Sequence, residues 1–162
     1  MYRTPHGSPA RPDRRLIVPG RGVGHAVVGR STAEEVLEHF GHDCKVSHYP
    51  SREVFQISYD YENDDDYAAS RPAQAARPSA FAFEFGLLQS IVIGVFQKEL
   101  ATAEGVRIGM PRRAVVGRLG EPSRLVAEKA FDVLRYVELG IQLEISREDD
   151  SLTRMVIFRA PT

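Results

Sequence analysis

The sequence predicts an α+β fold in which two diverged helix-plus-three-strand repeats form an antiparallel sheet with helices on one face. The first observation behind this prediction is a recurrence along the 162-residue chain. A short apolar stretch ending in glycine, a helical segment and a closing glycine occur at residues 22–41 and again at 104–122. The second observation is the alternation of apolar and polar residues after each helical segment, which is typical of strands with one buried face.

The repeats divide the chain into three parts that we expect to form one compact domain. Residues 1–15 are rich in Pro and Arg and predict a flexible tail. Residues 16–100 form the first repeat and residues 101–162 the second. Within the first repeat, residues 62–79 are acidic and then rich in Ala and Pro, which predicts a long mobile loop.

In each repeat a helix is expected to follow the short apolar strand that ends in Gly29 or Gly109. Ser31 and Glu34 have the spacing of a capping box, in which each side chain bonds the other residue's backbone amide. In the second repeat the helix begins at Pro111, whose missing N–H costs nothing at a first helical position. Apolar residues at helical spacing predict one buried stripe on each helix. These are Ala33, Val36, Leu37 and Phe40 in the first and Val115, Val116 and Leu119 in the second.

Three strands follow each predicted helix. In the first repeat they cover residues 55–61, 81–85 and the stretch after Gly86; in the second they cover 131–138, 141–145 and 151–158. Residues 81–85 and 141–145 match position for position as apolar, variable, apolar, Glu, apolar. Because side chains alternate across a strand, the polar members would share the face away from the helices.

This polar face and the acidic loop are the predicted partner-binding surface. Aromatic side chains such as Tyr67 are good anchors in a binding loop, because they supply contact area at little entropic cost. The predicted partner-binding residues are Gln56, Ser58, Asp60, Asp64, Asp65, Asp66, Tyr67, Glu84, Arg135, Gln142 and Glu144.

Composition excludes several classes of partner and predicts a cytoplasmic location. The net charge of −1 gives no electrostatic footprint for nucleic acid or an anionic membrane. The apolar runs are too short to span a bilayer, and no secretory signal is recognised at the start of the chain. Cys44 is the single cysteine, so an intrachain disulfide cannot form.

No motif in the sequence predicts a cofactor or a catalytic group. Residues 24–32 differ from a phosphate-binding loop chiefly at Arg30, which stands where that loop requires Lys. The repeat itself explains the glycines of this segment. We therefore expect no cofactor, no catalytic residue and no enzymatic activity.

One alternative is a module that binds a metal or another small ligand. Its candidate ligands are four residues close together in the sequence, namely His39, His42, Cys44 and His48. Their spacing fits no compact zinc template, and His39 also suits the C-terminus of the first helix, where it would interact with the helix dipole. The leading prediction therefore has no metal site, and the His39–His48 cluster stays open as the alternative.

The motif of strand, Gly, helix and Gly followed by strands resembles the small outer-membrane lipoprotein family SmpA/OmlA (BamE-like). In tandem it resembles the beta-lactamase inhibitory protein. The chain departs from the lipoproteins in lacking a lipidation cysteine near its start. The residues that carry the resemblance are Gly29, Ser31, Glu34, Val36 and Gly41 in the first repeat, and Gly109, Pro111, Val115, Gly120 and Pro122 in the second.

The resemblance implies a non-enzymatic protein that binds other proteins through its sheet face or loops. Together with the absence of catalytic motifs, it predicts a cytoplasmic protein-binding module. A concrete version is an immunity protein that neutralises a bacterial toxin or effector by binding it.

Overall fold

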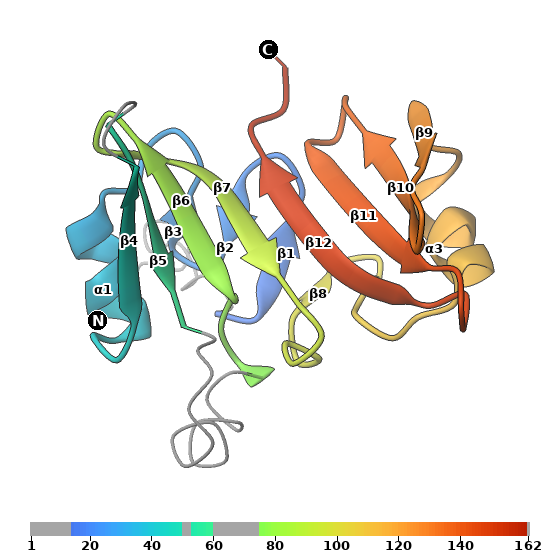
Figure 1. Cartoon of the computed structure of the whole chain (residues 1–162), viewed down its shortest axis with the longest axis horizontal. Coiled ribbons are helices and arrows are strands. Elements are labelled where there is room, and N and C mark those ends of the chain that lie inside the picture. The colour runs from blue at the N-terminus through green and yellow to red at the C-terminus, as the bar shows by residue number, and fades with distance from the viewer. Residues whose placement is uncertain (1–13, 50–52, 60–74, 162) are drawn as a thin grey trace, which may run out of the picture.

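The fold is dominated by one eight-stranded antiparallel sheet (Figure 1). The computed structural model describes residues 14–49, 53–59 and 75–161. Along the sheet the strands are β4 (Lys45–Tyr49), β5 (Val54–Ser58), β6 (Ala80–Glu84), β7 (Leu87–Ile93), β12 (Leu152–Phe158), β11 (Ile141–Ser146), β10 (Phe131–Tyr136) and β9 (Arg124–Ala127). Pairing of β7 with β12 joins the early and the late strands of the chain into one continuous sheet.

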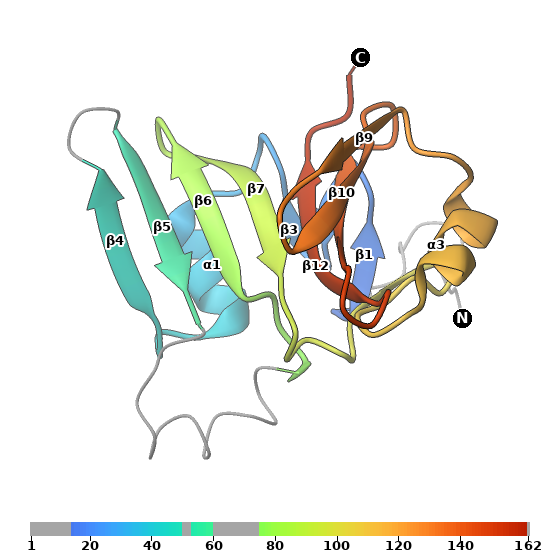
Figure 2. The same cartoon turned by 45° about the vertical axis from the view of Figure 1, so that its right-hand side comes forward.

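A second layer covers one side of this sheet. It consists of α1 (Ala33–Phe40), α3 (Arg112–Leu119) and a four-stranded sheet of very short strands. These strands are β3 (Ala26–Val27), β2 (Gly22–Val23), β1 (Leu16–Val18) and β8 (Ala101–Thr102), and β1 pairs parallel with β8. In Figure 1 the large sheet faces the viewer and the second layer lies behind it, as the turned view in Figure 2 also shows.

The hydrophobic core lies between the two layers. Strand register aligns one buried residue from each of six neighbouring strands in a single row across the large sheet. The row is Ile57, Phe81, Ile91, Ile157, Ile141 and Tyr136, each at most 4% exposed. Burying each of these side chains contributes roughly 1.5–3 kcal/mol, so the row is a main source of stability.

The predicted fold class is wrong. The protein is mostly β, built on sheets of eight and four strands, rather than an α+β fold of helix-plus-three-strand repeats. Each helix has only eight residues, and the large sheet contains four strands after each of them. The additional strands, β4 and β9, are edge strands without a buried residue, so they carry no alternation that a sequence pattern would reveal.

The first helix begins one residue later than predicted. Thr32 is its N-cap, and Thr32 and Glu35 form the capping box that was predicted for Ser31 and Glu34. Ser31 is instead buried, and its Oγ accepts a hydrogen bond of 2.8 Å from the Val27 amide. In α3, Pro111 is likewise the N-cap rather than the first helical residue.

A tyrosine ties the C-terminus of each helix to the large sheet. The hydroxyl of Tyr59 donates a 2.8 Å hydrogen bond to the carbonyl of Gly41, the C-cap of α1. The hydroxyl of Tyr136 donates a bond of the same length to the carbonyl of Gly120, the C-cap of α3. Both phenol rings are buried, so each bond satisfies a helix-end carbonyl that would otherwise lack a partner.

Candidate functional site

The side of the large sheet that faces away from the second layer is called the open face here. The predicted partner-binding residues that the structure describes all point to it, because each is next to a core residue in its strand. Gln56 and Ser58 flank buried Ile57, and Gln142 and Glu144 flank buried Leu143. Glu84 follows buried Phe83, and Arg135 lies between buried Leu134 and Tyr136.

Register brings residues from opposite ends of the chain into one row on the open face. The row runs through Ser58, Ala80, Val92, Val156, Gln142 and Arg135. The sequence pattern shows which residues share a face, but the order of strands is needed to place Ser58 and Arg135 on the same line. The middle of the row is aliphatic, and polar side chains lie toward both ends.

The polar side chains at the β10–β12 end of the open face hold one another in place. The Arg135 Nη1 donates a 2.6 Å hydrogen bond to the Oε1 of Gln142, and its guanidinium lies 4.5 Å from the centre of the Phe158 ring. The Arg154 Nη1 lies 3.5 Å from the Oε2 of Glu144. Such partly exposed pairs add little stability, about 0–1 kcal/mol, but they fix the direction of the side chains.

The opposite end of the open face carries exposed aromatic and apolar residues that the sequence prediction missed. Strand register aligns one residue from each of β4 to β7 in a row, in the order Tyr49, Val54, Glu84 and Leu87. Phe85 lies beside them in the two-residue turn between β6 and β7, with 71% of its surface exposed; Tyr49 is 51% exposed. Clustering of exposed aromatics is typical of contact surfaces.

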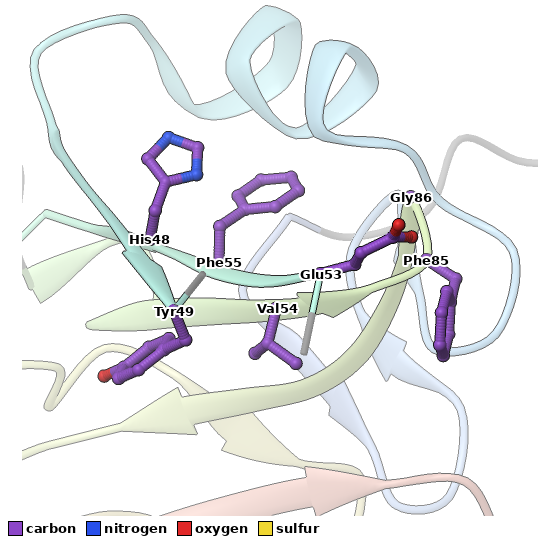
Figure 3. Close-up of a pocket in the computed structure, with 7 residues that line it drawn as sticks. All are labelled: His48, Tyr49, Glu53, Val54, Phe55, Phe85 and Gly86. Atoms are coloured by element: carbon purple, nitrogen blue, oxygen red, sulfur yellow. The ribbon is translucent and has the colours of Figure 1, made fainter. Parts of the chain in front are cut away.

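A hollow of about 400 Å³ opens at this end of the sheet (Figure 3). Figure 3 shows His48 and Phe55 on one side of the ribbon and Tyr49 and Val54 on the other, so the hollow lies at the rim of the sheet. The carboxylate of Glu53 points toward the turn at Phe85. The described residues that line the hollow are His48, Tyr49, Glu53, Val54, Phe55, Phe85 and Gly86.

Five predicted partner-binding residues lie outside the described residues, as does most of the predicted tail. They are Asp60, from the predicted strand 55–61, and Asp64, Asp65, Asp66 and Tyr67 from the predicted loop. From Ala75 onward the chain is described again, and Ser79 already hydrogen bonds with Tyr59 and Val92 as an extension of the β6 pairing.

The His39–His48 cluster is spread over the structure. The ring of His39 stacks on His25 at a centroid distance of 4.4 Å, whereas the ring of His48 lies 5.7 Å from Phe55. Burial raises the pKa of the Cys44 thiol, with Arg77 opposing the change. In the described part of the chain, no group of three or more His, Cys, Asp or Glu side chains is placed to hold a metal ion.

The tyrosines and aspartates with shifted pKa values make hydrogen bonds that stabilise the fold. Burial raises the pKa of Tyr59 to about 12 and also raises that of Tyr136, and both hydroxyls bond helix-end carbonyls. Hydrogen bonding from Arg147 is the main cause that lowers the pKa of Asp132. For Asp149 the main cause is a hydrogen bond from Ser151 within the same turn. Burial explains the shifts of the two tyrosines, and hydrogen bonds within the scaffold explain those of the two aspartates, so none of the four points to a nucleophile and its base.

No family model and no curated protein matches the chain. Among solved structures, the chain is similar to a cysteine-rich secretory protein from Staphylococcus aureus, with 11% identity and a TM-score of 0.52 over 91% of this chain. The chain spans about half the length of that protein, 49%. It is also similar to a DUF4309 family protein from Bacillus subtilis, with 13% identity and a TM-score of 0.45, covering 86% of this chain and 88% of the other.

The likeness to the Staphylococcus aureus protein shows a shared fold and nothing about activity. Neither description names the lipoprotein family that the sequence resembles, so that resemblance stays a prediction. In the described residues, no helix is long and apolar enough to cross a membrane.

Proposed function

We propose that the protein is a non-enzymatic protein-binding module whose contact surface is the open face of the large sheet. The observation that carries this proposal is that the second layer covers only one side of the large sheet. Within the described ranges, both helices and the small sheet pack against the same side, and the other side presents aligned polar and aliphatic residues. A wide sheet face left without a covering layer is a natural platform for another protein.

The chemistry of the open face suits a protein partner. Val92 and Val156 give its centre an aliphatic character, while polar side chains surround them, and this arrangement is common in interfaces. The bond between Arg135 and Gln142 orders both side chains before binding. Ordering in advance lowers the entropic cost of association.

In the version of this proposal that we favour, the partner is a bacterial toxin or effector, and the chain is its cytoplasmic immunity protein. Support comes from the small scaffold, the broad open face and the carboxylates of Glu53 and Glu84 at one end of it, which would attract a basic partner. The fold alone does not imply this function, so the partner must be identified by experiment.

Site-specific photo-cross-linking in cells tests the proposal. A photoreactive amino acid replaces Gln56 or Gln142 on the open face, and, as matched controls, Glu38 on α1 or Arg113 on α3, which are exposed on the other side. The expected result is one defined protein adduct from Gln56 and Gln142 and none from the controls.

Co-purification with the product of the neighbouring reading frame then tests the toxin version. If that product binds, replacing Gln142 with Lys should weaken binding at least tenfold, whereas Glu38→Lys should not. Cross-links that come only from the helix side would contradict the open face as the contact surface.

A further inference from the structure

We propose that the acidic and aromatic end of the open face binds a cationic side chain, Lys or Arg, of the protein partner. This end is called the Phe85 end and consists of Tyr49, Glu53, Glu84, Phe85 and Leu87. The inference rests on the proposed function, because it names the kind of side chain that the open face would receive from a partner. Three observations support it, concerning backbone conformation, exposed surface and charge.

The first observation is the backbone conformation of Phe85. The turn between β6 and β7 consists of Phe85 and Gly86, whose φ angles are 52° and 84°. Turns with two positive φ angles favour Asn-Gly, because a bulky side chain is strained in the left-handed region. Phe85 is 71% exposed, so its packing offsets little of this strain. Strain of this kind, retained without a packing reason, is typical of functional positions.

The second observation is the aromatic and apolar surface beside Phe85. Tyr49 is 51% exposed and Leu87 is 40% exposed, and both project from the same face of the sheet. Together with the hollow described above, they offer a place where the aliphatic stem of a long side chain could pack (Figure 3).

The third observation is charge. The carboxylates of Glu53 and Glu84 are exposed, and neither has a hydrogen bond or an ion pair within the described ranges. Among the described residues that line the hollow there is no Lys or Arg. An apolar partner residue would strip water from both carboxylates without replacing it, which is unfavourable. A cationic side chain would pair with the carboxylates and could stack on Tyr49 or Phe85.

The test uses two small probes that differ in charge, N-acetyl-arginine amide and the nearly isosteric N-acetyl-citrulline amide. Each is titrated into the ¹⁵N-labelled protein at constant ionic strength, and amide chemical shifts are followed. Saturable shifts are expected at Glu53, Phe85 and Gly86 with the arginine probe, and shifts at least fivefold smaller with the citrulline probe. Glu53→Gln together with Glu84→Gln should weaken arginine binding at least threefold, whereas Glu38→Gln on α1 should leave it unchanged.

Two outcomes would overturn the inference. Equal shifts with both probes would show an apolar site without preference for a cation, and no shifts at the Phe85 end would show no site. Either result leaves the photo-cross-linking test of the open face unaffected, so failure here is distinguishable from failure of the proposed function. Spectra of the variants that match the parent spectrum elsewhere exclude misfolding as the reason.

Discussion

The backbone amide of Phe85 donates a 3.3 Å hydrogen bond to the carbonyl of Glu53, and both residues have left-handed backbone conformations. Their φ angles are 52° and 49°. A residue other than Gly, Asn or Asp in this region costs roughly 1–2 kcal/mol. The strained backbone at Glu53 and Phe85 therefore lowers the stability of the fold at the Phe85 end of the sheet. The exposed aromatic residues Tyr49 and Phe85 lie at the same end.

Replacing Phe85 with Asn should stabilise the protein by about 1 kcal/mol. Asn tolerates the left-handed conformation, and little packing is lost because the Phe85 ring is mostly exposed. Urea denaturation at pH 7 measures the change in the free energy of unfolding. Leu87→Asn is the matched control: it removes an exposed apolar residue from an ordinary strand position and should be neutral or slightly destabilising. A loss of stability in Phe85→Asn would show that the turn is not strained.

Gly140 should not tolerate even a methyl group. A Cβ atom there would lie 2.3 Å from the Cα of Gly20 and 2.5 Å from the carbonyl oxygen of Phe158, and the φ of Gly140 is 77°. Both neighbours are backbone and cannot move aside, so we expect Gly140→Ala to destabilise the protein by roughly 3 kcal/mol or more. At Gly86 the φ is also positive, but apart from the adjoining residues no atom of the described part of the chain would lie within 4 Å of an added Cβ, so Gly86→Ala should cost only about 1 kcal/mol. Thermal unfolding of both variants compares the two costs.

The strands with one buried side could be predicted because burial leaves a period of two in the sequence. Residues 81–85 were expected to form a strand, and β6 covers Ala80–Glu84 with Phe81 and Phe83 fully buried. The turns at Gly86 and Gly140 were also correctly placed, since each glycine has a positive φ. The closing glycines of the helices, Gly41 and Gly120, are C-caps as the pattern indicated.

The fold class could not be predicted because much of the β structure leaves no periodic signal. The edge strand β4 is exposed on both faces except at half-buried Ser47, so its residues need not alternate. The strands of the small sheet have two or three residues, too few to show a period. The capping residues made the helices easy to recognise in the sequence. The prediction consequently overestimated how much of the fold is helical.

The composition of the open face could be predicted, but its arrangement could not. Alternation with Ile57 and Leu143 indicated that Gln56 and Gln142 point away from the core. Which strands are neighbours depends on pairings between distant segments, such as β7 with β12, which no local pattern encodes. Phe85 was assigned to a strand, because its exposure arises from the turn geometry rather than from its neighbours in sequence.

Asp132 should make folding stability depend on pH in the acid range. It accepts hydrogen bonds from Arg147 at 2.8 Å and from Arg112 at 3.0 Å, which links β10 to the β11–β12 turn and to α3. The hydrogen bond from Arg147 is the largest cause that lowers the pKa of Asp132 below its ordinary value of 3.8. Because the folded state favours the ionised form, this stabilisation is complete above pH 3.8 and is lost as the pH falls further.

The variant Asp132→Asn tests this assignment. It should be less stable than the parent at pH 7, and the difference should shrink as the pH falls below 3.8, where the parent also loses the carboxylate. Urea denaturation between pH 2.5 and pH 7 follows the difference. Glu138→Gln, an exposed position without an ion pair among the described residues, should show no such trend. A difference that stays constant with pH would mean that packing, rather than charge, explains the loss.

Tyr59 should make the protein sensitive to alkali. Burial raises the pKa of its hydroxyl from 10.0 to about 12, so the folded state favours the neutral phenol. In the unfolded chain the phenol ionises near pH 10, and stability is therefore complete below pH 10 and lost as the pH rises toward 12. At about 1.36 kcal/mol for each pH unit, a rise of the pKa from 10.0 to about 12 corresponds to a loss of roughly 3 kcal/mol.

Tyr59→Phe separates the two contributions of this hydroxyl. At pH 7 the variant should be destabilised by about 1–2 kcal/mol, because the carbonyl of Gly41 loses its 2.8 Å hydrogen bond. Between pH 10 and pH 12 its stability should fall less steeply than that of the parent, since the group that ionises is gone. Tyr136→Phe repeats the test at the second helix: it removes the equivalent bond to Gly120, and because burial also raises the pKa of Tyr136, the stability of this variant should likewise fall less steeply in alkali. Guanidinium denaturation across this pH range measures the slopes, and a slope for Tyr59→Phe equal to that of the parent would show that Tyr59 ionises normally in the folded protein.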